Sequence, residues 1–334
     1  MKDIARDLGV SVVTVSKVLR NVPEVGDETR RRVLKRMQEL DYRPNHAARS
    51  LATGRAMMMG LIVPDLVHPF FAQVAKGASG ALRKEGYALV ISSSEQDPDL
   101  EREEIGQMLA RRLDVLLIAS AQWRVDSFRA IEAQKRQYVL IDRRFDGLST
   151  HFVGTDDFEV GRLATEHLIQ TGHSRIAHIG GTDISTALDR FRGYRNALMQ
   201  HRLPEPPEYV VSRSHADDAG DKAGYDAMTH LLALKPPPDA VFCYNDPMAM
   251  GAMEAVLDAG LEIPRDVAII GCGNVKYSRM LRVPLSSIDQ NSEGMGEQAA
   301  ALALEIAGSK TLVRPKTILQ RPALVARAST VSAK

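Results

Sequence analysis

The stretch "GVSVVTVSKVLRN", residues 9–21, predicts a short amphipathic helix that begins after Ser11. On one side, Val15, Val18 and Leu19 fall within about 100° of one another, as a buried stripe does. The outer face is polar and basic apart from two valines, and it holds Val12, Val13, Ser16, Lys17 and Arg20. The two valines either extend a small core or face a partner.

The flanking sequence predicts two further helices. Asp3 to Leu8 reads as a short helix that Gly9 ends, and a third helix runs from about Asp27 to Leu40 before Pro44. A short helix, a Gly-containing turn and a second helix match the helix-turn-helix motif.

Charge is unevenly distributed along the 334 residues, although the net charge is only +1. Residues 1–56 hold 12 Lys or Arg and 7 Asp or Glu, a net of +5, whereas the remainder has a net of −4. We call residues 1–56 the head and the remainder the body. A basic head followed by a slightly acidic body predicts that only the head binds a polyanion.

Composition narrows the class of protein. A hydrophobic content of 44% with 25% charged residues is typical of a soluble globular chain, and two cysteines imply no disulfide framework. Neither a membrane span nor a signal peptide is recognisable, so we expect a cytoplasmic protein. Nucleotide-binding, hydrolase and zinc-protease motifs are also missing, which argues against an enzyme. We expect no metal and no cofactor.

From about Met59 the pattern changes to short apolar runs that alternate with helical stretches. The runs are "MGLIVPDL" (59–66), "YALVISSS" (87–94), "VLLIAS" (115–120), "YVLID" (138–142), "HFVGTD" (151–156), "RIAHIGG" (175–181), "YVVSRS" (209–214), "AVFCYND" (240–246) and "VAIIGCGN" (267–274). Such alternation is typical of buried parallel strands with crossover helices. About nine such strand–helix units are more than a single sheet usually holds. The pattern therefore predicts two α/β subdomains with a cleft between them.

At this point "DIARDLGVSVVTVSKVL" (3–19), "RPNHAARSL" (43–51) and the strand–helix body resemble the LacI/GalR family of bacterial transcription regulators. The resemblance implies a small all-α helix-turn-helix domain followed by an α/β two-subdomain periplasmic-binding-protein-like (type I) effector domain with parallel sheets. The expected divisions are 1–44 for DNA binding, 45–56 for a hinge helix and linker, and 57–334 for effector binding and dimerisation. Within the last, the N-subdomain covers about 57–156 and 291–318, and the C-subdomain about 157–290 and 319–334.

The resemblance assigns DNA contacts to the head. Val12 and Val13 stand at positions that face base edges, where a valine can pack on the C5-methyl of thymine. Polar contacts to bases or phosphates are expected from Thr14, Ser16, Lys17 and Arg20. In the hinge, Leu51 resembles the family's wedge, which is inserted at a base step to kink DNA, unless it caps the body domain. The other minor-groove or hinge residues are Asn45, Ala48 and Arg49.

Ligand contacts are expected at the carboxyl ends of the strands, where open α/β sheets bind ligands. By resemblance, the effector-binding residues are Phe70, Phe71, Asp142, Thr186, Arg190, Asn245 and Gln290. Alternatives stay open for some of them. Phe71 is equally compatible with the core, Asp142 and Arg190 can pair structurally, and Asp246 is better explained as the cap of the next helix.

Three positions depart from the family pattern. Where family members commonly carry an aromatic residue and then an acid that binds ligand hydroxyls, this chain has Cys272 and Gly273. The position of the family's aromatic platform for sugar rings is occupied by Ala219. A sugar effector therefore competes with a differently shaped or acidic metabolite. The sequence starts at Met1, with Lys2 and Asp3 already at the entrance of the first helix, so either this helix lacks its usual cap or the true start lies upstream.

Taken together, we expect a repressor that binds a pseudo-palindromic, double-stranded DNA operator as a homodimer, because one helix-turn-helix reads one half-site. A small-molecule effector in the cleft, a sugar or other metabolite, would change the spacing of the two hinges and so the affinity for the operator. The alternative is a solute-binding protein of the periplasmic type without a regulatory role.

Overall fold

The computed structural model describes residues 1–19, 23–42, 55–122, 125–145, 147–212 and 220–331. Its contacts divide the chain into two compact units, Met1–Ala56 and Met57–Lys334. No helix within the described ranges is both long and apolar enough to cross a membrane.

The first unit contains helices α1 (Lys2–Leu8), α2 (Val12–Leu19) and α3 (Asp27–Glu39). Gly9 ends α1 in the left-handed conformation with φ 65°, which glycine adopts without strain. Ser11 caps α2, because its Oγ accepts a hydrogen bond from the Thr14 backbone N–H at 2.9 Å. The core that joins the helices consists of Ile4, Ala5, Val15, Val18, Val25 and Val33. The predicted helix-turn-helix is confirmed.

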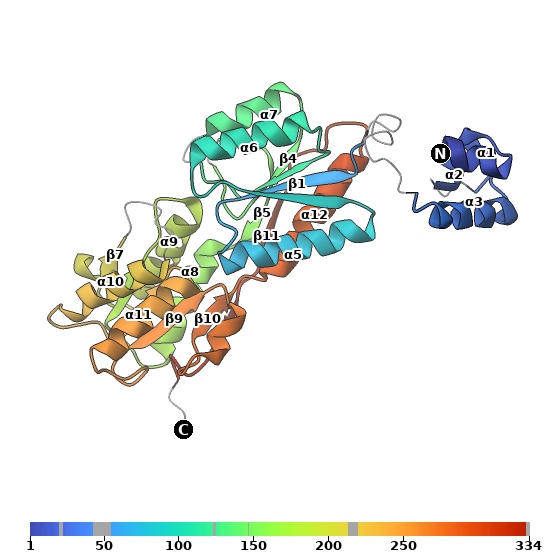
Figure 1. Cartoon of the computed structure of the whole chain (residues 1–334). Helices are drawn as coiled ribbons and strands as arrows, with labels where there is room; N and C mark the ends of the chain where they lie inside the picture. Colours follow the sequence, from blue (N-terminus) through green and yellow to red (C-terminus); the bar gives the residue numbers. More distant parts are fainter. Residues whose placement is uncertain (20–22, 43–54, 123–124, 146, 213–219, 332–334) are drawn as a thin grey trace. The chain divides into compact units, whose positions relative to one another are not determined.

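In the second unit, one parallel sheet has the strand order β11-β5-β4-β3-β1-β2 (Figure 1). Its strands are β1 (Met58–Val63), β2 (Ala88–Ser93), β3 (Leu116–Ile118), β4 (Tyr138–Ile141), β5 (His151–Thr155) and β11 (Thr317–Gln320). Helices α5 (Pro69–Lys84) and α12 (Ser292–Gly308) cover one face. The other face packs against α6 (Pro98–Ala110), η1 (Val125–Phe128) and α7 (Arg129–Ala133).

The second sheet has the order β12-β10-β9-β8-β6-β7 and is parallel except for β12, which runs antiparallel to β10. Its strands are β6 (Ile176–Ile179), β7 (Val210–Val211), β8 (Ala240–Cys243), β9 (Ala268–Cys272), β10 (Ser286–Asp289) and β12 (Ala323–Val325). Helices α8 (Asp157–Gln170) and α9 (Ser185–Gln200) pack on one face, and α10 (Gly220–Leu232) and α11 (Asp246–Asp258) on the other. The short helices are η2 (Pro207–Tyr209) and η3 (Lys276–Met280).

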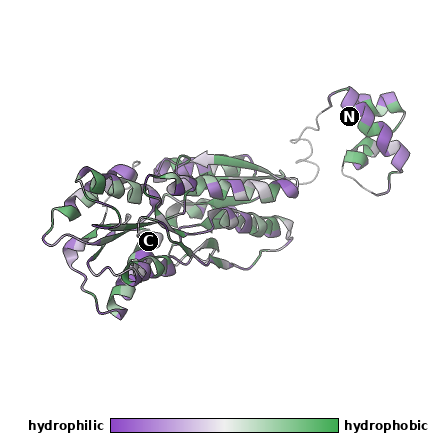
Figure 2. Cartoon of the chain, turned by 90° about the horizontal axis from the view of Figure 1, so that it is seen from below, coloured by the Kyte–Doolittle hydropathy of each residue, from purple (hydrophilic) through white to green (hydrophobic). Residues whose placement is uncertain are grey.

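The predicted alternation of strands and helices in two sheets is confirmed. Each of the apolar runs contains one of the strands β1 to β9, and colouring by hydropathy shows apolar strands enclosed by helices with polar outer surfaces (Figure 2). Strands β10, β11 and β12 were not among the predicted runs. Both sheets are parallel as predicted, and the one antiparallel strand among the described residues is β12 at the edge of the second sheet.

Candidate functional site

The outer face of α2 carries the predicted DNA contacts of the head. Val13 and Val12 are 61% and 41% exposed, so neither belongs to the head's core. Lys17, on the same face, donates from Nζ to Oε2 of Glu24 at 2.6 Å. The Thr14 hydroxyl lies 2.8 Å from that of Ser11. An exposed apolar pair beside a cation is the surface that a major-groove helix presents to base edges and phosphates.

Several predicted DNA-binding residues lie outside the described residues. They are Arg20 in the head and Asn45, Ala48, Arg49 and Leu51 in the hinge. Their roles, like those of the residues on α2, stay predictions.

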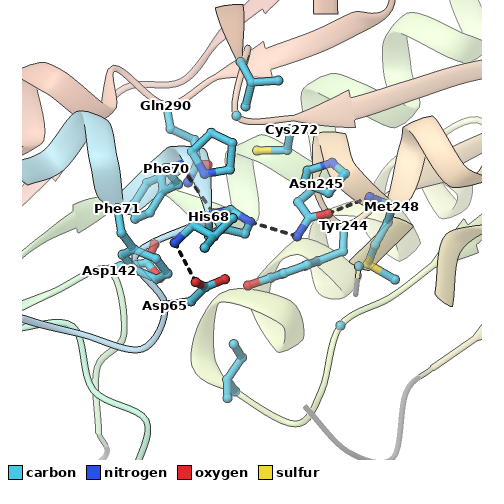
Figure 3. Close-up of a pocket in the computed structure, with 18 of the residues that line it drawn as sticks. Asp65, His68, Phe70, Phe71, Asp142, Tyr244, Asn245, Met248, Cys272 and Gln290 are labelled. Carbon is cyan, nitrogen blue, oxygen red and sulfur yellow. Dashed lines mark hydrogen bonds between the residues drawn. The ribbon is translucent and has the colours of Figure 1, made fainter. Parts of the chain in front are cut away.

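In the second unit, a cavity of about 280 Å³ lies at the carboxyl ends of strands from both sheets (Figure 3). Six of the seven predicted effector residues line it: Phe70, Phe71, Asp142, Arg190, Asn245 and Gln290. Phe71 also belongs to the core of the first sheet, so its placement in the core is confirmed and its contact with an effector stays a prediction. Thr186 is not among the lining residues. Thr186 is buried, and its hydroxyl lies 2.7 Å from the hydroxyl of Tyr244, which does line the cavity.

Arg190 is held in place by protein groups rather than by Asp142. Its Nε donates to Asp157 Oδ1 at 2.8 Å, and its Nη1 donates to the Tyr244 carbonyl at 2.7 Å. The guanidinium also lies 4.5 Å from the centre of the Tyr244 ring. Gly161 makes this possible, because a Cβ there would lie 1.9 Å from the Arg190 carbonyl oxygen where α8 crosses α9. No hydrogen bond or close ion pair joins Asp142 to Arg190 among the described residues, so the alternative of a structural pair is limited to the effect of the Arg190 charge on the pKa of Asp142.

Asp142 remains available to a ligand. It follows β4 with φ 67°, lines the cavity, and its carboxylate has no hydrogen-bond partner among the described residues. Burial raises the pKa of Asp142 and, to about 7, that of Asp157, while Arg190 opposes both shifts. An unpaired carboxylate of this kind suits a ligand that supplies hydroxyl or N–H donors.

Two helix caps face each other across the cavity. His68 Nδ1 accepts from the Phe70 backbone N–H at 3.3 Å, and Asn245 Oδ1 accepts from the Met248 backbone N–H at 2.9 Å. Asn245 Nδ2 lies 3.4 Å from His68 Nε2 (Figure 3). Burial lowers the pKa of His68 to about 4, so the ring is neutral and one nitrogen carries a proton.

A singly protonated ring has one accepting nitrogen, so it cannot accept from both Phe70 N–H and Asn245 Nδ2. One of these donors therefore lacks an acceptor. An oxygen of a bound ligand would satisfy it.

Sequence reasoning missed four groups at this site: His68, Arg143, Asp157 and Tyr244. Three lie close to predicted residues, since His68 comes two residues before Phe70, Arg143 follows Asp142 and Tyr244 precedes Asn245. Arg143 lines the cavity and donates from Nη1 to the Ser120 carbonyl at 2.7 Å. Its Nε is buried without a hydrogen-bond partner in the described part of the chain.

Asp246 has a structural role that differs from the predicted helix cap, because Asn245 is the cap of α11. The buried Asp246 carboxylate accepts hydrogen bonds from Val275 N–H, Ser278 Oγ and Ser287 Oγ at 2.6–3.0 Å. It therefore fixes the loop after β9 rather than the ligand.

Positions 272 and 273 line the cavity without charge. Cys272 is buried, and burial raises the pKa of its thiol to about 12. Gly273 adopts φ 122°, which L side chains rarely adopt, and a Cβ there would be in ordinary contact with Val275 Cγ1 at 3.8 Å. Ala219 lies outside the described residues. Among the residues that the structure describes, no cluster of three or more His, Cys, Asp or Glu could hold a metal ion.

Comparison with known proteins adds relatives over nearly the whole chain. Residues 1–45 match the model "Bacterial regulatory proteins, lacI family", and residues 165–330 match "Periplasmic binding protein-like domain". The transcriptional repressor PurR of Actinobacillus pleuropneumoniae is 31% identical, with 98% of this chain and 97% of the relative covered. The transcriptional regulator GalR of Salmonella typhimurium is 37% identical, with 98% and 95% covered.

Solved structures agree with this assignment. A complex of the transcriptional regulator CelR with cellobiose is 28% identical with a TM-score of 0.74, and 98% of each chain is covered. A Lac repressor dimer bound to operator shares the fold, with a TM-score of 0.85, 24% identity, and 99% of this chain and 98% of that chain covered. This chain belongs to the LacI family of bacterial transcription regulators.

Proposed function

We propose that this chain is a cytoplasmic transcriptional repressor that binds a pseudo-palindromic operator as a homodimer. The observation that carries the proposal is the exposed pair Val12 and Val13 on α2, held outward by a complete three-helix core. In this proposal α2 lies in the major groove, with Thr14, Ser16, Lys17 and Arg20 as polar contacts. Residues 1–44 bind DNA and 45–56 form the hinge.

The hinge residues Asn45, Ala48, Arg49 and Leu51 bind the minor groove in this proposal, with Leu51 as the wedge that kinks the DNA. Residues 57–334 then bind the effector and dimerise. The N-subdomain covers about 57–156 and 291–318, and the C-subdomain about 157–290 and 319–334. Like its relatives, the chain acts as a regulator and not as an enzyme.

The cavity binds a small metabolite that controls operator affinity. The Asp142 carboxylate can accept hydrogen bonds from ligand donors, and the remaining N–H groups of Arg190 can donate to ligand acceptors. Beside His68, either the Phe70 N–H or Asn245 Nδ2 lacks an acceptor, which a ligand oxygen can supply. A polyhydroxylated ligand such as a sugar meets these demands, as does an acidic metabolite that also pairs with Arg143. The ligand would favour one arrangement of the two subdomains and thereby shift operator affinity.

Selection of operators from a random DNA pool tests this function. Full-length protein at a fixed salt concentration should enrich a palindrome with a kinkable central step. Adding a mixture of metabolites should weaken or strengthen binding to that palindrome. A folded dimer that enriches no sequence, with and without metabolites, would overturn the proposal and favour a solute-binding protein.

A further inference from the structure

Among the cations of the proposed DNA-binding face, Lys17 is tied to an acid that follows α2. Its Nζ lies 2.6 Å from Glu24 Oε2, and the two side chains are 38% and 69% exposed. The hydrogen bond from Lys17, followed by its charge, lowers the pKa of Glu24, so the carboxylate is ionised at neutral pH. The ammonium therefore sits beside a negative charge on the surface proposed to meet DNA.

This placement differs from the other acidic partners in the head. Asp3 pairs with Arg6 on α1, and Asp7 and Glu39 pair with Arg36 on α3. Lys17 instead lies one helical turn after the exposed Val13 on α2. A carboxylate on a DNA-binding face repels phosphates. Glu24 therefore either weakens DNA binding or has a role that compensates for the repulsion.

The geometry allows such a role because an ammonium has three donors. One donor engages Glu24, and the other two stay available to acceptors such as O6 and N7 of guanine. A base edge can thus be bound without breaking the ion pair. A phosphate contact on DNA of arbitrary sequence instead brings a second anion close to the Glu24 carboxylate, and repulsion between the two negative charges opposes that contact.

We propose that Glu24 is a specificity-determining residue, which positions Lys17 for a base edge and withholds it from phosphates. The proposal rests on the DNA-binding function proposed for α2. Glu24 lowers affinity for arbitrary DNA more than affinity for the operator, and so increases the ratio between them.

The Glu24→Gln variant tests this role by fluorescence anisotropy on a duplex of arbitrary sequence and on the operator enriched by the wild type. Freed Lys17 should bind one more phosphate per subunit, so the slope of log affinity against log salt should steepen by about 1.8 per dimer. At low salt, we expect affinity for arbitrary DNA to rise by only about three- to tenfold, since a single exposed ion pair has a small effect on free energy. The ratio of operator to arbitrary affinity should fall.

The matched control is Glu39→Gln, which removes the same charge from an exposed ion pair on α3. It should leave the salt slope within experimental scatter of the wild type. The double variant Lys17→Gln/Glu24→Gln should lose the steeper slope of Glu24→Gln. If Glu24→Gln and Glu39→Gln behave alike, or if the double variant keeps the steep slope, Glu24 does not act through Lys17.

Lys17→Gln alone keeps the proposal testable if Glu24→Gln unfolds, which thermal denaturation followed by circular dichroism detects. Because Glu24 withholds Lys17 from phosphates, Lys17→Gln should weaken operator binding and leave the salt slope on arbitrary DNA unchanged. A shallower slope on arbitrary DNA would overturn the proposal. Failure of the proposed function looks different, since the wild type would then enrich no operator at all.

Discussion

Arg190 Nε donates to Asp157 Oδ1 at 2.8 Å, and this pairing leaves the carboxylate of Asp142 facing the cavity. Both carboxylates are buried near the Arg190 guanidinium, but only Asp157 accepts a hydrogen bond from it. The two acids therefore divide their roles. Asp157 orients Arg190, and the carboxylate of Asp142 is available to a ligand.

Two isosteric substitutions separate these roles. Asp142→Asn replaces a buried carboxyl group that has no hydrogen-bond partner among the described residues, at a φ of 67° that Asn tolerates, so the free energy of unfolding should stay the same or rise. Asp157→Asn leaves Arg190 without its acid and should lower the free energy of unfolding by about 3 kcal/mol. Urea unfolding at pH 8, above the pKa of about 7 for Asp157, measures both.

The same variants differ in regulation. Asp142→Asn should bind the operator but lose its response to the metabolite mixture that shifts the wild type. A fully responsive Asp142→Asn protein would show that this carboxylate is not a ligand contact.

The close crossing of α5 and α12 predicts a steric effect. A Cβ at Gly77 on α5 would lie 2.0 Å from the Glu293 carbonyl oxygen of α12, whereas one at Gly80 would meet nothing within 4 Å. Gly77→Ala should therefore destabilise the protein by about 1–3 kcal/mol. Gly80→Ala on the same helix should stabilise it by about 0.5–1 kcal/mol, because Ala has the higher helix propensity. Equal shifts of the urea midpoint in the two variants would contradict this explanation.

His178 predicts a dependence of stability on pH. Its ring stacks on Phe242 at 4.9 Å and its Nδ1 donates to the Phe242 carbonyl at 3.0 Å. Burial lowers the pKa of His178 from 6.5 to about 4. Between these values the unfolded chain binds the proton and the folded protein does not, so stability falls as the pH falls. At pH 5 this one group should cost about 2 kcal/mol relative to pH 8.

The variant His178→Phe keeps an aromatic ring in the stack and removes the titrating nitrogen. The loss of unfolding free energy between pH 8 and pH 5 should shrink by about 2 kcal/mol relative to the wild type. Burial also lowers the pKa of His68, His151, His167 and His173, so a residual dependence should remain. An unchanged difference would show that His178 does not titrate as a buried neutral group.

Strands β1 to β9 were predictable because they are short apolar runs, mostly buried, but β10, β11 and β12 were not. In β10, Ser286 and Ser287 are fully buried, and hydrogen bonds to Thr330 and Asp246 satisfy their hydroxyls. Such a strand has no apolar run to recognise. In β11 and β12 the side chains are largely exposed, as expected at sheet edges, so burial leaves little pattern there.

The cleft was predictable to a similar degree. Asp142, Asn245 and Gln290 directly follow or end strands, and parallel strands bring their carboxyl ends together. The partner of Arg190 was not predictable, because Asp157 begins α8 and reaches Arg190 only through the close crossing at Gly161. That contact depends on tertiary packing between segments 33 residues apart.

The exposed valine on α2 makes the last prediction. Val13→Ala shortens a side chain that is 61% exposed and should therefore leave the stability of the head unchanged. If the valine packs on a thymine methyl, the variant should lose its preference for thymine at one position of each half-site, by about five- to tenfold, within the range of a single mismatch. Affinities for operators substituted one base pair at a time measure this loss. Leu34→Ala on α3, which shortens another exposed apolar side chain, is the matched control and should keep the wild-type preferences. A uniform loss of affinity across all operators after Val13→Ala would mean that the valine contributes contact area without reading sequence.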